Sequence, residues 1–307
     1  MIKTSKEILK SKFVGSFLGT AVGDAMGARY EGLPYGISFT KTNMGRYTDD
    51  TQMMIGIAES LIENKGFNGK RMAYTFIKNF DPSRGYGLGP PLVFRWISSG
   101  EAWDKASEKL FGGEGSFGNG SAMRVAPIGC FYHDDPDKLR KIAYKSSQIT
   151  HSHELGRQGA ALQAYAIALA INSGPCLNRD YFLEKLDDFA EHDVYKKKLK
   201  TIESLLGLRP SRSKVVKELG NGIEAFNSVP TAIYCFAWAE SFQESILFAI
   251  SLGGDTDTIA AMTGAISGAF YGVEGIPNSW KNKLEDREKG RSHIEKLAKE
   301  LWSIKYG

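Results

Sequence analysis

Residues 13–32 read FVGSFLGTAVGDAMGARYEG, with a glycine at every fourth position from Gly15 to Gly27. On an α-helix this spacing aligns the glycines on one face, because positions i and i+4 lie one above the other. A face without side chains lets the backbone of another helix approach closely. Glu31 continues the spacing, and Asp24 lies about two turns before it on nearly the same face. The stretch therefore predicts a closely packed helix with acidic residues towards its end.

Helical periodicity recurs along most of the chain. The ranges with helical spacing are 48–63, 153–171, 179–219, 229–240, 241–252 and 260–271. No stretch shows the sustained alternation of a β-strand. The glycine-rich stretches 81–91 and 111–124 are typical of loops. Since there is neither a repeat array nor a low-complexity linker, the sequence predicts a single compact all-α domain over residues 1–307.

The composition excludes several other classes of protein. The 307 residues are 42% hydrophobic and 24% charged, as is usual for a globular protein. The net charge is only +4 and the basic residues are mixed with acids, so we expect no nucleic-acid partner. There is no signal-peptide pattern and no apolar run of roughly 18 residues, so we expect a cytoplasmic protein with no membrane partner. The three separated cysteines, Cys130, Cys176 and Cys235, are expected to be reduced core thiols.

Two pairs of aspartates stand at the start of predicted helices. Asp255 and Asp257 lie in residues 251–272, SLGGDTDTIAAMTGAISGAFYG, and Asp49 and Asp50 lie at the start of the helix over 48–63. One acid per start is explained by helix capping. Two per start would repel each other near a buried helix unless a cation lay between them. Because no His or Cys stands nearby, the residue types favour Mg²⁺, Mn²⁺ or Ca²⁺ over zinc.

Other carboxylate chemistries fit the sequence less well. An EF-hand loop starting at Asp255 would need glycine at its sixth position, where Ala260 stands. The DTDT sequence is also similar to the Asp-x-Asp-x-Thr motif of haloacid-dehalogenase-type phosphatases, which lies at a strand end. No parallel strands are expected here, which argues against that alternative. Glu31 could be an ordinary glutamate at a helix end or a general base, and its spacing does not decide between the two.

Two further segments contain residue types that bind anions. Residues 115–124, GSFGNGSAMR, precede a helix, and glycines there would let backbone N–H groups converge on a phosphate. The stretch lacks the Gly-Lys-Ser/Thr ending of a P-loop, so a flexible loop is the alternative. His151 and His153 are two apart, but no other cluster of His or Cys supports a zinc site. A histidine that contacts a ligand at a loop–helix junction is at least as good an interpretation.

Five motifs in order resemble the ADP-ribosylglycohydrolases. They read GDAMGARYEG, YTDDTQMM, GSFGNGSAMR, THSHELGRQGAALQA and LGGDTDTIAAMTGAISGAFYG. The resemblance runs from about Phe13 to Trp280. Within the family the chain looks closest to the ADP-ribosylserine hydrolases, through RGYGLGPP, NSVPTAIYCFAWA and SLGGDTDTIA.

The resemblance implies an all-α fold with a central dinuclear metal site that holds two divalent cations, usually Mg²⁺, with Mn²⁺ as an alternative. It implies that Glu31 is the catalytic glutamate. The implied metal ligands are Thr48, Asp49, Asp50, Asp255, Asp257 and Thr258. The implied substrate-binding residues are Tyr86, Gly115, Ser116, Phe117, Gly118, Asn119 and His151. Phe117 stands where the family often has Tyr, so a ring is retained and a hydroxyl is absent.

The function implied is a metal-dependent hydrolase that removes ADP-ribose from O-linked acceptors. ADP-ribosylserine is the first substrate expected, with poly(ADP-ribose) and O-acetyl-ADP-ribose as further ones. Departure of the acceptor from C1 of the ribose creates oxocarbenium character that carboxylates can stabilise. The alternatives are an ADP-ribosylarginine hydrolase, a non-catalytic ADP-ribose-binding module and a phosphatase with Asp255 as nucleophile. The partners expected are ADP-ribose and ADP-ribosylated proteins, and without a heptad pattern we expect a monomer.

Overall fold

The computed structural model describes residues 5–36, 44–208 and 210–307, which contain helices and no strand. The α-helices are α1 Ser5–Gly27, α2 Asp49–Asn64, α3 Gly69–Asn79, α4 Gly89–Ser98, α5 Ala126–Phe131, α6 Pro136–Gln148, α7 Glu154–Asn172, α8 Arg179–Phe189, α9 Asp193–Leu208, α10 Arg212–Leu219, α11 Ala225–Trp238, α12 Phe242–Ser251, α13 Thr256–Tyr271, α14 Asn278–Lys281 and α15 Arg291–Tyr306. Short 3₁₀ segments are η1 Pro82–Arg84, η2 Ala106–Gly113, η3 Asn119–Ser121 and η4 Val273–Gly275. The expected all-α class is confirmed.

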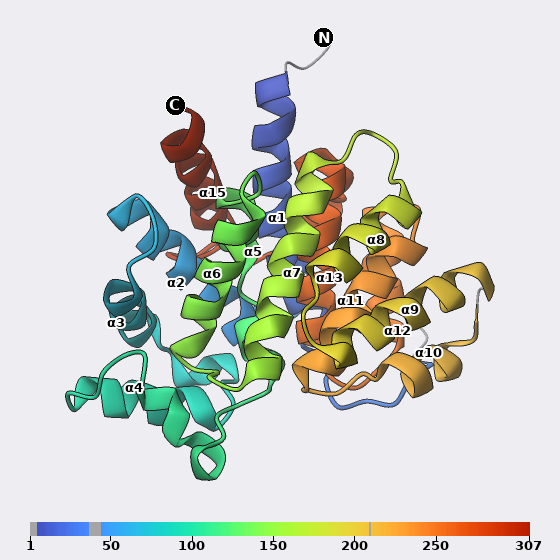
Figure 1. Cartoon of the computed structure of the whole chain (residues 1–307). Helices are drawn as coiled ribbons and strands as arrows, with labels where there is room; N and C mark the ends of the chain where they lie inside the picture. Colours follow the sequence, from blue (N-terminus) through green and yellow to red (C-terminus); the bar gives the residue numbers. More distant parts are fainter. Residues whose placement is uncertain (1–4, 37–43, 209) are drawn as a thin grey trace.

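Helices α1 and α13 pack antiparallel at the centre of the molecule (Figure 1). The glycine stripe of α1 forms this contact: a Cβ atom at Gly15, Gly19 or Gly23 would lie closer than 3.0 Å to a backbone carbonyl oxygen of α13. The facing helix also places glycines at the contact, Gly264 and Gly268. The two backbones can touch only because these positions carry no side chain.

The other helices cover this central pair. Helices α7, α11 and α12 pack against α13, whereas α2 and α15 pack against α1. Every residue from Thr256 to Phe270 is buried, so α13 has neighbours on all its faces. A helix this apolar all round is stable only inside a core. The buried apolar residues of these helices form one contiguous cluster.

The antiparallel arrangement determines where the functional residues meet. Helix α1 ends at Gly27 where α13 begins at Thr256, and the Thr256 hydroxyl donates a hydrogen bond to the Gly27 carbonyl oxygen at 2.9 Å. The first turn of α2 packs at the same end of the core, where the Thr48 N–H donates to Asp24 of α1. One end of the central pair therefore gathers the end of α1 and the starts of α2 and α13.

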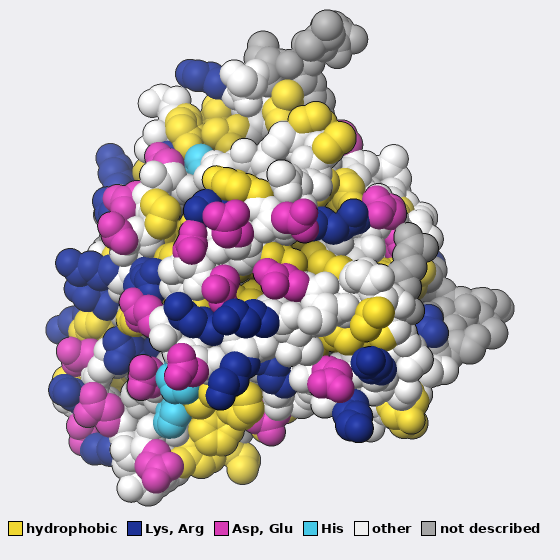
Figure 2. Space-filling model, turned by 45° about the vertical axis from the view of Figure 1, so that its right-hand side comes forward, with side chains coloured by type: hydrophobic (Ala, Val, Ile, Leu, Met, Phe, Trp, Pro, Cys, Tyr) yellow, Lys and Arg dark blue, Asp and Glu magenta, His cyan; other side chains and the backbone are white. Residues whose placement is uncertain are grey.

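The surface charges, the helix lengths and the cysteines bear on expectations drawn from the composition. On the face shown in Figure 2, Lys and Arg side chains are interspersed with Asp and Glu, as on an ordinary solvated surface. Within the part of the chain that the structure describes, no helix is both long and apolar enough to span a bilayer. Cys130 and Cys235 are buried as expected, but Cys176 is exposed in the loop after α7. The expectation of three core thiols was therefore wrong for Cys176.

Candidate active site

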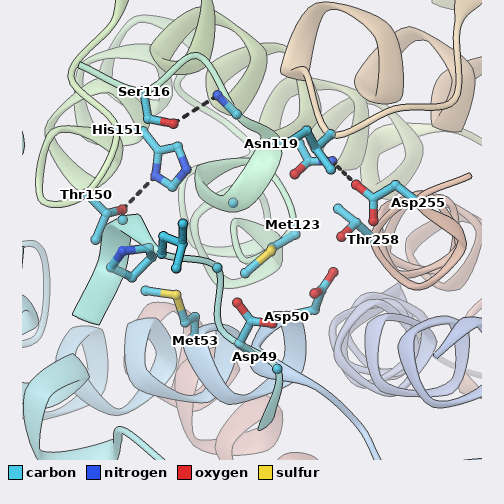
Figure 3. A pocket seen from close by; sticks show the side chains of 18 of the residues that line it. Asp49, Asp50, Met53, Ser116, Asn119, Met123, Thr150, His151, Asp255 and Thr258 are labelled. Carbon is cyan, nitrogen blue, oxygen red and sulfur yellow. Dashed lines mark hydrogen bonds between the residues drawn. The ribbon is translucent and has the colours of Figure 1, made fainter. Parts of the chain in front are cut away.

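The two aspartate pairs and Glu31 converge on one pocket. Its lining includes Glu31, Asp49, Asp50, Asp255 and Asp257, which come from three segments of the chain. Figure 3 shows Asp49 and Asp50 on one side of the pocket and Asp255 on another. Carboxylate oxygens of Glu31, Asp255 and Asp257 all lie within 4.8 Å of one another. Sequence spacing could not show this convergence, because it depends on how α1, α2 and α13 pack.

A pair of backbone hydrogen bonds places Glu31 beside Asp255. The Gly32 N–H donates to the Gly254 carbonyl oxygen at 2.8 Å, and the Gly254 N–H donates to the Leu33 carbonyl oxygen at 2.9 Å. Gly254 has a φ of 73°, which a residue with a side chain rarely adopts. Asp255 thus lies in a tight turn between α12 and α13, whereas the phosphatase alternative requires its aspartate at a strand end.

Asp24 holds the first turn of α2 against α1. This carboxylate is fully buried and accepts hydrogen bonds from the Thr48 N–H, the Thr51 N–H and the Thr51 hydroxyl. Thr48 is the N-cap of α2, and its hydroxyl hydrogen-bonds to the Asp50 carboxylate at 3.0 Å. Thr48 therefore supports an acidic residue of the pocket and does not itself line the pocket.

Burial and mutual repulsion raise the pKa values of the acidic residues. Burial, followed by the charge of Asp24, raises the pKa of Asp49 to about 7 and that of Asp50 well above its usual range. Burial and the charge of Asp255 raise the pKa of Asp257 well above its usual range. The same two causes also raise the pKa of Glu31. These shifts indicate negative charges without a cationic partner.

The donor set fits a hard divalent cation. Among the described residues, no Lys, Arg or His forms an ion pair with Asp49, Asp50, Asp255 or Asp257. The Oδ1 atom of Asp50 is buried and has no hydrogen-bond partner. Every ligand atom the cluster offers is an oxygen, which Mg²⁺ and Mn²⁺ prefer. The acidic cluster could therefore hold a metal ion.

The loop over 115–120 forms the opposite wall and is anchored to its surroundings. The Asn119 amide donates to Asp255 Oδ2 at 2.6 Å and to the Ser228 hydroxyl at 3.0 Å. The Asn119 N–H donates to the Ile223 carbonyl oxygen at 2.9 Å, and the Ser116 hydroxyl accepts from the Gly118 N–H at 3.1 Å (Figure 3). These contacts fix the loop to the acidic cluster, so the loop has a defined conformation in spite of its glycines.

The structure brings some predicted substrate-binding residues to the pocket and leaves others behind it. Of the predicted substrate-binding residues, Ser116, Gly118, Asn119 and His151 line the pocket, and Thr258, a predicted metal ligand, lines it as well.

Three of the predicted substrate-binding residues lie outside this lining. The Tyr86 hydroxyl donates to Gln52 Oε1 at 2.8 Å, and its ring packs against Phe80. The Phe117 ring turns away and packs against His153. Gly115 has a φ of 74° and lies against Ser152, so it shapes the loop rather than lining the pocket.

Comparison with known proteins assigns the family. The ADP-ribosylglycohydrolase family model matches residues 5–306. The chain belongs to the ADP-ribosylglycohydrolase family. It is 38% identical to ADP-ribosylhydrolase ARH3 of Bos taurus, over 91% of this chain and 90% of that protein. It is 37% identical to ADP-ribosylhydrolase ARH3 of Homo sapiens, again over 91% of this chain and 90% of that protein.

The fold agrees with this assignment. A solved structure described as an ADP-ribosylglycohydrolase-related protein complex has a TM-score of 0.78 to this chain at 28% identity. The match covers 97% of this chain and 99% of that one. The suspected resemblance to the ADP-ribosylglycohydrolases is confirmed.

Several residues at the site of this ADP-ribosylglycohydrolase were not predicted from its sequence. Asp24 is the clearest, because its carboxylate supports α2 from within α1. An acid near the end of an otherwise apolar, glycine-rich helix was the available signal. Thr150, Met53 and Met123 also line the pocket, and they carried no signal beyond lying next to motif residues.

Proposed function

We propose that this protein is a metal-dependent hydrolase that removes ADP-ribose from O-linked acceptors, with ADP-ribosylserine as its principal substrate. Poly(ADP-ribose) and O-acetyl-ADP-ribose are further substrates in this proposal. The observation that carries it is the convergence of the Asp49–Asp50 pair, the Asp255–Asp257 pair and Glu31 on one pocket. The relatives named ADP-ribosylhydrolase ARH3, at 37–38% identity over most of both chains, support the same conclusion.

The acidic cluster would hold two Mg²⁺ ions, for which Mn²⁺ can substitute. Asp49 and Asp50 would form one set of ligands together with Thr48, whose hydroxyl lies outside the pocket lining but beside the Asp50 carboxylate. Asp255, Asp257 and Thr258 would form the other. When bound, the cations supply Lewis acidity and neutralise the repulsion between the carboxylates.

Glu31 would act as the general base in this proposal. It is the most exposed acid of the cluster, and it lies beside Asp255 at the pocket. A carboxylate there can orient and deprotonate the water that attacks C1 of the ribose. Asp255 and Asp257, whose carboxylate oxygens lie within 4.8 Å of that of Glu31, would stabilise the positive charge that develops on the sugar as the acceptor leaves. Asn119 and His151 would bind the rest of the ADP-ribosyl group on the opposite wall.

Release of ADP-ribose from matched peptides tests this proposal. The peptides carry ADP-ribosylserine or ADP-ribosylarginine in the same sequence, and each is incubated with MgCl₂ or with EDTA. We expect Mg²⁺-dependent release from the serine-linked peptide and little from the arginine-linked one. The Asp257→Asn variant serves as the control without a complete acidic cluster.

The other outcomes assign the alternatives. Preferential release from the arginine-linked peptide would make the protein an ADP-ribosylarginine hydrolase. Binding of ADP-ribose without release from either peptide would make it a binding module. Full activity in excess EDTA would refute metal dependence. We also infer that the protein acts as a monomer, and its mass in solution by light scattering tests this.

A further inference from the structure

Arg124 is a buried cation without an acidic partner among the described residues. Its side chain is 0% exposed. Nη1 donates to the Thr150 hydroxyl oxygen at 2.8 Å, and Nη2 donates to the Ser146 carbonyl oxygen at 2.9 Å. Its Nε atom has no hydrogen-bond partner. The Cζ atom of the guanidinium lies 4.8 Å from the centroid of the Phe76 ring. Burial of an uncompensated charge is costly, so a role beyond packing is indicated.

The hydrogen bonds of Arg124 determine which nitrogen of His151 carries the proton. A guanidinium can only donate, so the Thr150 oxygen must accept from Arg124. The Thr150 oxygen has room to accept a second hydrogen bond, but its single hydroxyl hydrogen has no other acceptor among the described residues than His151 Nδ1, which lies 2.8 Å away. Nδ1 is therefore the acceptor, and the neutral imidazole carries its proton on Nε2.

The surroundings of His151 keep its imidazole neutral near pH 7. Burial, followed by the positive charge of Arg124, lowers the pKa of His151 to about 3. Burial also lowers the pKa of Arg124, to about 9, so the guanidinium is still protonated at neutral pH. Arg124 thus keeps a charge that helps to exclude a second proton from His151.

The Nε2 side of the ring faces the glycine loop of the pocket. A Cβ atom at Gly120 would lie 2.9 Å from Nε2, and one at Gly118 would lie 3.5 Å from it. No described residue accepts a hydrogen bond from Nε2. Figure 3 shows the ring between Thr150 and the pocket interior, on the wall away from Asp50.

This wall needs a donor because the described pocket lining contains acids but no Lys or Arg. On the wall away from the acidic cluster an anionic ligand would therefore be held by neutral donors, and a fixed N–H group in a buried position is a strong one. A histidine with its proton on the other nitrogen would instead present a lone pair and repel a phosphate oxygen.

We propose that Arg124 and Thr150 are positioning residues that hold His151 as a neutral Nε2–H donor to the diphosphate of the ADP-ribosyl group. The identity of the ligand rests on the proposed function, whereas the position of the proton does not. Glycines 118 and 120 keep the space in front of this donor open.

Nitrogen NMR of the histidine side chains, without ligand, tests the position of the proton. The wild-type protein should show the Nε2–H tautomer for His151, with no change towards the imidazolium near pH 6. Thr150→Val removes the hydroxyl and keeps the shape, so the Nδ1–H tautomer should become populated. Thr150→Ser keeps the hydroxyl and should retain the wild-type signal. An Nδ1–H tautomer in the wild-type protein, or an unchanged tautomer in Thr150→Val, would overturn the assignment.

Binding of ADP-ribose by titration calorimetry tests the ligand. Loss of one hydrogen bond to a charged group raises the Kd by about tenfold, which we expect for Thr150→Val but not for Thr150→Ser. A wild-type affinity for Thr150→Val would refute the role in binding. If the wild-type protein binds no ADP-ribose, the ligand half of the proposal fails with the proposed function, while the spectra still decide the position of the proton. The wild-type spectrum needs no variant, so poor folding of Thr150→Val leaves the proposal testable.

Discussion

Asp24 and Thr51 join the two helices that carry the first half of the acidic cluster. Asp24 Oδ2 accepts from the Thr51 N–H at 3.0 Å and from the Thr51 hydroxyl at 2.5 Å. Asp24 lies in α1 and Thr51 in the first turn of α2, immediately after Asp49 and Asp50. The position of these two acids relative to α13 therefore depends on a third, buried carboxylate.

Asp24→Asn should destabilise the protein and weaken metal binding together. The amide keeps the shape of the carboxylate but directs an NH₂ group at the Thr48 or Thr51 N–H groups. An unsatisfied buried donor costs about 1–3 kcal/mol, which should appear as a lower free energy of unfolding in urea with EDTA present. Affinity for Mg²⁺ should fall as well, because the first turn of α2 shifts.

Asp135→Asn is the matched control for this change. Asp135 caps α6 by accepting from the Lys138 N–H and is exposed, and asparagine caps helices equally well. We expect no change in stability or Mg²⁺ affinity. Wild-type stability of Asp24→Asn would show that the hydrogen bonds to Thr51 contribute little.

Local sequence patterns predicted the helices well. They did not predict which helices pack against each other. The glycine spacing predicted a face for close approach, and α1 has that face. Its partner, α13, lies about 240 residues later, and no local pattern joins the two. Helix α11 also begins at Ala225, before the expected start at 229, because Pro230 is accommodated inside the helix. The loop expected over 81–91 ends early, since Pro90 and Pro91 occupy the first turn of α4.

In the candidate site, too, some features were predictable from the sequence and others depend on packing. Paired aspartates at helix starts could be read from the sequence because excess charge at a buried helix is locally conspicuous. Tyr86 shows the opposite case: its motif indicated a ligand contact, but packing on Phe80 and the hydrogen bond to Gln52 turn it behind the pocket. Where a side chain points depends on tertiary contacts that spacing does not contain.

Gly19→Ala should be severely destabilising, although alanine favours helices. Its Cβ would overlap the Gly264 carbonyl group of α13, and both sides of the contact are backbone that cannot rotate away. We expect a loss of about 3 kcal/mol or more in the free energy of unfolding, or failure to fold. Gly207→Ala is the matched control, because Gly207 lies in α9 with open space around it. That change should be neutral or stabilise by about 0.5–1 kcal/mol. Equal effects of the two substitutions would contradict the close approach of α1 and α13.

Stabilisation by Mg²⁺ should increase with pH. The pKa of Asp49 is raised from 3.8 to about 7 in the folded protein, chiefly by burial. Between these values the metal-free folded state binds more protons than the unfolded state, so its stability falls as pH rises. Metal binding requires deprotonated carboxylates and should reverse this loss.

Unfolding temperatures with MgCl₂ and with EDTA, near pH 5 and near pH 8, measure this effect. The difference between MgCl₂ and EDTA should be small at about pH 5 and large at about pH 8. Asp49→Asn should lose most of the Mg²⁺ effect at both values of pH. A Mg²⁺ effect that is equal at both, or larger at the lower pH, would count against a metal held by these acids.

Glu31→Gln should abolish turnover and largely retain ADP-ribose binding. The amide keeps the size of the side chain but cannot accept a proton, so we expect turnover to fall by about 100-fold or more. Burial and the Asp255 charge raise the pKa of Glu31, so wild-type activity should decline on the acid side at a higher pH than for an ordinary glutamate. The decline runs towards low pH because a base must be deprotonated to act. Glu114→Gln, an exposed glutamate outside the pocket lining, should leave both turnover and the pH profile unchanged. If Glu31→Gln turned over at the wild-type rate, the water would have to be activated by another group.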